Sequence, residues 1–231
     1  MADGRIEIDT RINEKGAQKG LNSLQRKVSG SAKKMQKVGG QMTKYITAPL
    51  AAVGAAGFAA ADQLDKAYRD IRVGTGAVGD DLEDLKDSFK EVFAEVPDDA
   101  EQVANALADL NTYTGATGEV LEGLTKNVLD ASRSLGEDGV NNASAFGKAM
   151  QQWQLPAEDG TQVLDQLFKM TQDYGVGLGE ISSHLTEYGS VLQNAGFNMQ
   201  ESADLMGRLE SNGISVSRIM PGLNMAFRNW A

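Results

Sequence analysis

The sequence contains no cysteine and only one histidine, His184, among 231 residues. Without cysteine, the chain has no disulfide framework, no thiolate nucleophile and no thiolate metal site. One histidine excludes a metal site built on a pair of histidines, and it makes a Ser-His-Asp triad depend on that single residue. Proline is also scarce, with four residues, whereas glycine occurs 26 times. We therefore expect glycine to mark most breaks between elements.

The formal net charge is −10, which argues against general DNA binding. The charge is unevenly distributed along the chain. Residues 1–46 contain ten Lys or Arg and four acidic residues, a net charge of +6, whereas residues 47–231 contain 12 and 28, a net charge of −16. An asymmetry of this size indicates that the two segments have different roles.

Residues 1–46 are predicted to form a basic arm. Polar and apolar residues alternate from Arg5 to Ile12, which predicts a short β-strand. From Gly16 the period changes to a heptad, which predicts a helix that pairs with copies of itself or with another helix. An amphipathic helix lying on its own domain is the alternative, and contact of the basic face with nucleic acid or anionic lipid is a weaker one. The predicted oligomer seam consists of Leu21, Leu24, Val28, Met35, Val38 and Met42.

Residues 47–73 are predicted to form a hydrophobic helix rich in Ala and Gly. No charged residue occurs between Lys44 and Asp62, and Thr47 followed by Pro49 is typical of a helix start. The uncharged stretch is shorter than the ~20 apolar residues that usually span a bilayer. Close packing between protein helices is the favoured interpretation, and a membrane role is the alternative. The candidate residues for either role are Leu50, Val53, Gly54, Gly57 and Phe58.

Residues 74–231 are predicted to form a helical-repeat core. Residues 75–85 and 114–124 are identical at seven of eleven positions, at an offset of 39, and weaker echoes follow. A period of 39–43 residues suits a helical hairpin. We therefore predict an all-α fold of stacked hairpins with a period of about 40 residues, with acidic residues in the first turns of the helices and glycine after their last turns. The pattern is expected to continue beyond Ala231.

Candidate enzyme sites have simpler interpretations. Ser183 and His184 are adjacent, and neighbours on a helix point about 100° apart, so they do not form a nucleophile–base pair. Pairs such as Asp80 and Asp81 are expected to be acids at a helix start. The glycines from Gly74 to Gly79 lack the preceding strand and the spacing of a dinucleotide site. The sequence therefore predicts no catalytic, cofactor-binding or metal-binding residues, and no cofactor.

Several segments resemble phage tail tape measure proteins of the lactococcal-phage type. They are the basic opening, residues 44–50 (KYITAPL), residues 73–77 (VGTGA) followed by 81–86 (DLEDLK), residues 188–203 (YGSVLQNAGFNMQESA) and the turn at residues 213–215. No one motif is diagnostic, but the order of the segments is distinctive and spans nearly the whole chain. Family members are usually much longer, which suggests that this chain is a portion of such a protein.

The resemblance implies a structural protein of a phage, prophage or phage-derived particle. Such a protein occupies the lumen of the tail tube, templates tail length and assembly, and leaves before the genome is delivered. The implied partners are further copies of itself in a coiled-coil oligomer such as a trimer, tail tube and tail-tip or baseplate proteins, and tail assembly chaperones. Assembly is expected in the cytoplasm of the host bacterium, without specific recognition of nucleic acid. The alternative is a membrane-active protein that inserts residues 45–61 into the host envelope during DNA ejection.

Overall fold

The computed structural model describes residues 57–222, which all lie within one compact unit. The predicted strand at residues 5–12 and the oligomer seam from Leu21 to Met42 lie outside the described residues. Of the predicted Ala/Gly helix, the structure describes the part from Gly57 onward. The basic arm, the strand and the seam therefore stay predictions.

Every regular element in the described residues is helical, and they contain no strand, so the all-α prediction is confirmed for this part of the chain. A further helical segment covers residues 216–222. The elements are α3 (Gly57–Thr75), α4 (Asp80–Glu95), α5 (Ala100–Thr114), α6 (Gly118–Leu135), α7 (Gly139–Gln152), the 3₁₀ helix η3 (Ala157–Asp159), α8 (Gly160–Tyr174), α9 (Leu178–Asn194) and α10 (Met199–Ser211).

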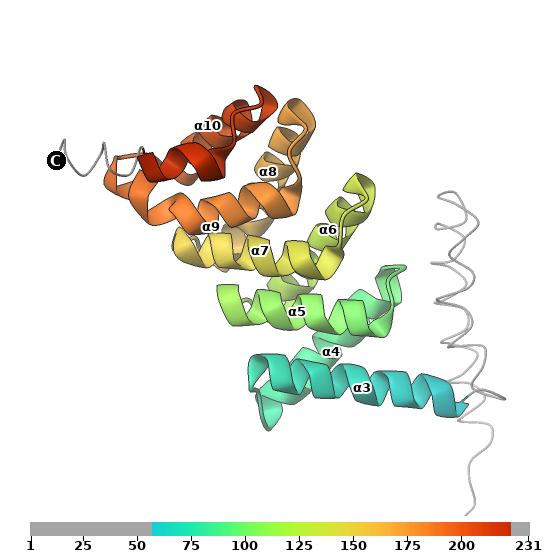
Figure 1. Ribbon diagram of the computed structural model, residues 1–231. Helices are drawn as coiled ribbons and strands as arrows, with labels where there is room; N and C mark the ends of the chain where they lie inside the picture. The colour runs from blue at the N-terminus through green and yellow to red at the C-terminus, as the bar shows by residue number, and fades with distance from the viewer. Residues whose placement is uncertain (1–56, 223–231) are drawn as a thin grey trace, which may run out of the picture. The chain divides into compact units, whose positions relative to one another are not determined.

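The helices form two layers (Figure 1). Helices α3, α5, α7 and α9 pack side by side in one layer, and α4, α6, α8 and α10 follow one another in the second. Each helix packs chiefly on helices one or two positions away in the chain. Helices α5, α7 and α9 begin at residues 100, 139 and 178, which are 39 residues apart. The described part is therefore a linear stack of helical hairpins in which each hairpin contacts its neighbours.

Two successive turns have the same local structure. Thr75 Oγ donates a hydrogen bond to Ile71 O (2.7 Å), and the amide of Ala77 donates to the same hydroxyl (3.1 Å). Thr114 makes the equivalent pair of bonds with Leu110 O (2.6 Å) and the amide of Ala116 (3.1 Å). The glycine that follows the threonine in each turn, Gly76 or Gly115, has a φ of about 70°, a conformation that glycine adopts without steric penalty. The repeated sequence thus encodes a repeated helix end.

The core lies between the layers and follows the helical spacing of apolar residues. In α6, Leu121, Leu124, Val128 and Leu129 are buried at intervals of one to four residues, which places them on one face. Phe89 and Phe146 are the largest side chains that are fully buried. Methionines fill the remaining space, as expected for an unbranched side chain, including Met150, Met206 and Met220.

Small residues let helices of the first layer approach closely. A Cβ atom added to Gly74 would lie 2.9 Å from Ala108 Cβ, and one added to Gly147 would lie 3.0 Å from Tyr113 Cβ. At Gly189 the added atom would lie 2.8 Å from Gln152 Cγ. These contacts join α3 to α5, α5 to α7 and α7 to α9, so glycine sets the separation between successive hairpins as well as the ends of helices.

Candidate functional site

An acidic groove of about 760 Å³ lies beside α4, where it meets the turn after α3 and the start of α6. Helix α4 contains seven acidic residues and two lysines. Its Asp84, Asp87 and Glu91 line the groove together with Glu122 of α6, which accepts a hydrogen bond from Ser88 Oγ (2.9 Å). The carboxylates are spread along the helix, so the groove attracts cationic groups by charge over several turns.

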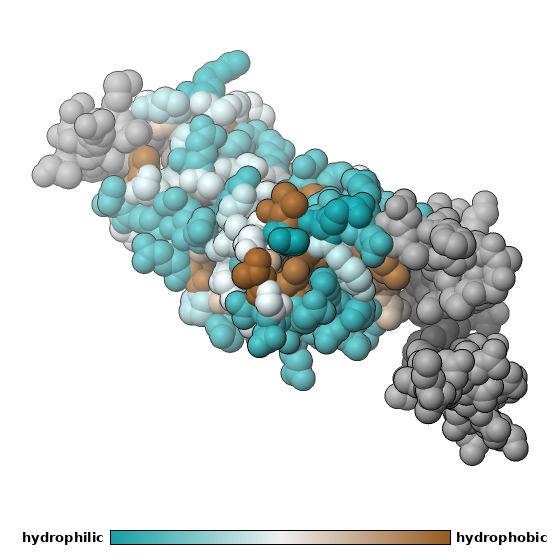
Figure 2. All heavy atoms as spheres, turned by 90° about the horizontal axis from the view of Figure 1, so that it is seen from below, coloured by the Kyte–Doolittle hydropathy of each residue, from teal (hydrophilic) through white to brown (hydrophobic). Residues whose placement is uncertain are grey.

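Two apolar side chains are exposed on either side of the turn between α3 and α4. Val73, near the end of α3, is 84% exposed, and Val78, just before α4, is 65% exposed. Figure 2 looks at this end of the described helices and shows hydrophobic residues surrounded by hydrophilic ones. The surface of the first hairpin therefore offers both carboxylates and exposed methyl groups.

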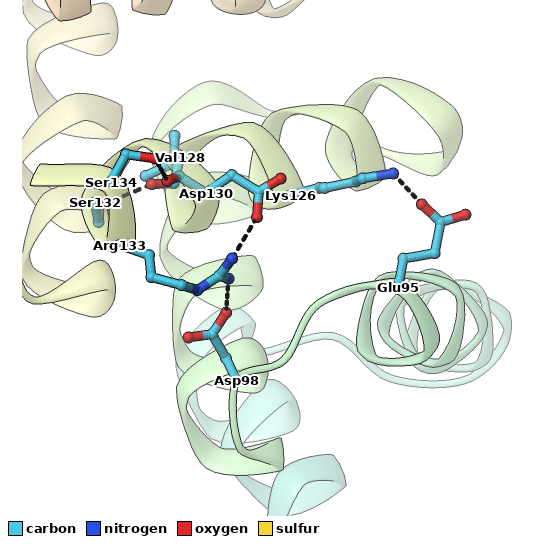
Figure 3. A network of polar contacts seen from close by, with 8 residues as sticks. All are labelled: Glu95, Asp98, Lys126, Val128, Asp130, Ser132, Arg133 and Ser134. Atoms are coloured by element: carbon cyan, nitrogen blue, oxygen red, sulfur yellow. Dashed lines mark hydrogen bonds and ion pairs between the residues drawn. The ribbon is translucent and has the colours of Figure 1, made fainter. Parts of the chain in front are cut away.

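Polar side chains join successive hairpins along the second layer (Figure 3). Arg133 of α6 lies between Asp130 of its own helix (2.9 Å) and Asp98 in the loop before α5 (2.5 Å). Lys126 of α6 reaches Glu95 at the end of α4. These side chains are 41–57% exposed except Asp98, at 18%, and exposed ion pairs usually stabilise a protein by less than about 1 kcal/mol each. They link α6 to the end of α4 and to the loop before α5.

Glu137 connects two hairpins from a more protected position. It lies in the short loop between α6 and α7, and its carboxylate accepts hydrogen bonds from the amides of Leu178 (3.1 Å) and Gly179 (3.3 Å) at the start of α9. Asn142 Nδ2 donates a third bond to it (2.8 Å). Helix α9 has no side-chain cap of its own, since its N-cap residue is Gly177. Glu137 therefore caps a helix that begins about 40 residues later.

A cluster of two carboxylates and an imidazole lies where α9 meets α10. Glu180 and His184 are one turn apart on α9, and Glu210 comes from α10. His184 Nε2 is 3.8 Å from Glu180 Oε1 and 3.6 Å from Glu210 Oε1. The histidine side chain is 13% exposed, and the buried Nε2 atom has no hydrogen-bond partner within the described part of the chain. This set of one nitrogen and two oxygen atoms is suited to a metal ion.

The interpretation of the sequence missed these two acids. The sequence predicted no metal-binding residues; His184 lies on α9, and Glu180 and Glu210 approach it. The spacing Glu180-x-x-x-His184 was visible in the sequence, because residues four apart share a helix face. Neither Glu210 nor the contact of Glu137 with α9 has a local sequence signal, since both depend on the stacking of hairpins.

The remaining candidate residues from the sequence either take part in ordinary helix structure or lie outside the described residues. Ser183 Oγ donates to Gly179 O within its own helix (2.7 Å), and Asp80 and Asp81 lie in the first turn of α4, as expected. Helix α3 contains Gly74 and precedes Gly76 and Gly79, whereas a dinucleotide site needs a strand before its glycines. The seam residues Leu21 to Met42 and the candidate segment residues Leu50, Val53 and Gly54 are outside the described residues.

Among the helices of residues 57–222, none is both long enough and apolar enough to cross a bilayer. Of residues 45–61, only the backbone of residues 57–61, at the start of α3, lies in this range. The insertion of residues 45–61 therefore stays a prediction.

The described residues form an all-helical stack in which each helix packs on its near neighbours. A family model described as phage-related minor tail protein matches residues 86–230, more than half of the sequence, and the chain belongs to this family. It is therefore a structural component of a phage tail. Comparisons with curated proteins and with solved structures gave no match.

Proposed function

We propose that this phage tail protein acts as a tape measure protein: it occupies the tail tube, templates tail length and assembly, and leaves before the genome passes. Three features support the proposal. The family is that of a minor tail protein, the order of segments resembles tape measure proteins, and the described hairpins form a linear stack. The linear stack is the main support, because removing or adding a unit changes the length of the stack without disturbing a closed core.

The proposal assigns no catalytic role to the chain. Its partners are further copies of itself through the seam from Leu21 to Met42, tube and tail-tip or baseplate proteins, and assembly chaperones. We expect the chain to be assembled in the host cytoplasm and to reside in the tail lumen. Size-exclusion chromatography with light scattering on the full chain and on a form lacking residues 1–46 tests the self-association. If both forms contain the same number of chains per oligomer, residues 1–46 do not drive self-association and the proposed seam is wrong.

Tail length is the direct test of the ruler. Removing residues 139–177 from the phage gene takes out one unit between the starts of α7 and α9, so α5 and α9 occupy successive positions of the stack. If these residues are drawn out as helix in the tube, the tail shortens by about 60 Å, at 1.5 Å per residue. Electron microscopy of purified particles gives the measurement. Assembled tails of unchanged length would show that this part of the chain does not set length.

A membrane role during ejection is the second candidate, favoured by the uncharged stretch between Lys44 and Asp62. Flotation of the full chain with liposomes, compared with a form lacking residues 45–61, tests it. Co-flotation that depends on residues 45–61 supports insertion. Absence of binding by either form removes this candidate and leaves the tape measure proposal standing.

A further inference from the structure

We propose that Glu180, His184 and Glu210 form a binding site for a divalent transition-metal ion of the zinc class. The proposal rests on the geometry of these three side chains and is independent of the tape measure function. It assigns a ligand to a place in the fold where a buried imidazole nitrogen faces two carboxylates.

The donor atoms are close to the arrangement that one ion requires. Zinc binds imidazole nitrogen and carboxylate oxygen at about 2.0–2.2 Å, so two ligand atoms on one ion lie roughly 3.0–3.5 Å apart. The two contacts of His184 Nε2, at 3.6 and 3.8 Å, are slightly longer, and all three donor atoms lie within 4.8 Å of one another. A modest movement of the side chains therefore brings them into a coordination sphere.

The side chains differ in how far they can move. Glu180 is 54% exposed, so its carboxylate reorients at little cost. Glu210 is held more firmly, because it is 21% exposed and its Oε1 accepts a hydrogen bond from the amide of Val216 (2.7 Å). His184 is fixed by burial on α9. Two preformed ligands and one adaptable ligand leave a fourth position for water, as in many zinc sites.

In the described part of the chain, His184 Nε2 lacks a hydrogen-bond partner and the two carboxylates lack a lysine or arginine partner. At 3.6 and 3.8 Å, the histidine nitrogen is too far from the carboxylates for a hydrogen bond. Within residues 57–222, no Lys or Arg forms an ion pair with Glu180 or Glu210. An imidazole ligand favours zinc or another first-row transition ion over magnesium or calcium, which prefer oxygen donors alone.

A bound ion would join three consecutive helical segments. Glu180 and His184 belong to α9, Glu210 belongs to α10, and Glu210 also contacts Val216 at the start of the helical segment 216–222. Because the ion binds the folded arrangement and not the unfolded chain, it stabilises this end of the described stack. The inferred role is therefore a structural clamp on the last described hairpin.

Titration of the purified full chain with Zn²⁺ after chelator treatment, followed by calorimetry, tests the site. We expect saturable binding of one ion per chain, with affinity reduced at least tenfold in Glu180→Gln and in His184→Gln. Glu180 is exposed, so its variant is expected to fold even if the change at His184 perturbs the helix pair. Glu187→Gln is the matched control, since Glu187 is an exposed acid on the same helix.

Replacing Zn²⁺ with Co²⁺ provides a second readout. Co²⁺ held by these three side chains and water is expected to absorb visible light more strongly than aqueous Co²⁺, and we expect this stronger absorption to be lost in His184→Gln and kept in Glu187→Gln. Absence of saturable Zn²⁺ binding by the wild-type chain would overturn the proposal. So would equal affinity in wild type, Glu180→Gln and His184→Gln.

Discussion

At the scale of single residues, long-range polar contacts decide how hairpins are joined. Glu137 is the clearest case, because its carboxylate satisfies the two amides of Leu178 and Gly179 on another hairpin. Space around this contact is limited: a Cβ atom added to Gly177 would lie 2.9 Å from Glu137 Oε1. The glycines at the start of α9 thus admit a cap supplied from outside the helix.

Changing Glu137 to Ala is expected to lower the free energy of unfolding by about 1–2 kcal/mol, the usual cost of losing a helix cap. Urea denaturation followed by circular dichroism measures the change. Glu101→Ala serves as a control, because Glu101 makes a largely exposed ion pair with Lys66. Equal effects of the two substitutions would argue that Glu137 acts only as a surface charge.

Tyr174 and Asp204 join α8 to α10 in a way that depends on pH. The Tyr174 hydroxyl donates a hydrogen bond to Asp204, and this bond, with a further one from Arg208 Nε (2.8 Å), lowers the pKa of the Asp204 carboxyl despite some burial. A carboxyl whose pKa is lower in the folded state stabilises the fold above its unfolded pKa. That stabilisation is lost as pH falls through the folded pKa, below 3.8.

We therefore expect Asp204→Asn to destabilise the chain at pH 7 and to have progressively less effect as pH falls through the folded pKa of Asp204, because the carboxyl is then protonated. Asp204 and its partner Arg208 are both partly exposed, so the effect at neutral pH is small. Denaturation curves of both proteins at several pH values measure it. Tyr174→Phe keeps the ring against Gly207 and removes only the hydroxyl, so in this background the effect of Asp204→Asn should be smaller. An effect of Asp204→Asn that is independent of pH would contradict this account.

At the scale of elements, the spacing of helices in the first layer depends on glycine at the contact. Gly147 of α7 faces the ring of Tyr113 on α5, and Trp153 at the end of α7 donates a hydrogen bond from Nε1 to Leu185 O on α9 (3.0 Å). Trp153 is 8% exposed, so this bond is formed within the core. The close contact of Gly147 with Tyr113 and the hydrogen bond from Trp153 to Leu185 O hold α7 between α5 and α9.

Gly147→Val is expected to destabilise the protein by about 1–3 kcal/mol, since the added methyl groups overpack the contact with Tyr113. Gly123→Ala is the matched control within α6, because no atom lies within 4 Å of the added Cβ. Alanine there should stabilise the helix by up to about 1 kcal/mol. Thermal unfolding of the two variants should therefore shift in opposite directions; a shift of the same sign would contradict the close-approach argument.

At the scale of the whole described unit, stability is spread along the stack. Each helix contacts chiefly its near neighbours, so loss of one end removes few contacts from the other. In such proteins stability is approximately a sum of terms from units and from the interfaces between them. The same property supports the proposed tape measure role, because a unit can be removed or added without disturbing a closed core.

A chain that ends at Gly177 lacks α9 and α10 but keeps the hairpins before them. We expect it to remain helical in its remaining part and to unfold at a lower denaturant concentration, with a smaller dependence on denaturant because less surface is exposed on unfolding. Circular dichroism and limited proteolysis measure both properties. Complete loss of helix would show that the stack folds as one indivisible unit.

The sequence by itself determined the helices of the described part and most of their ends. Apolar residues at helical spacing, acids such as Asp99 and Asp138 at the starts, and glycines such as Gly115 and Gly136 after the last turns are local signals, because capping and amphipathic burial act within a few residues. The repeat between residues 75–85 and 114–124 likewise specifies the same turn twice.

Only the tertiary structure decided which side chains meet between hairpins. Glu137 contacts α9 although about 40 residues separate them in the sequence, and Glu210 approaches His184 although 26 residues separate them. The local sequence pattern indicates neither contact. These contacts depend on the separation and angle of packed helices, which are set by the combined shape of many side chains. The candidate metal site therefore became visible only when α9 and α10 were placed together.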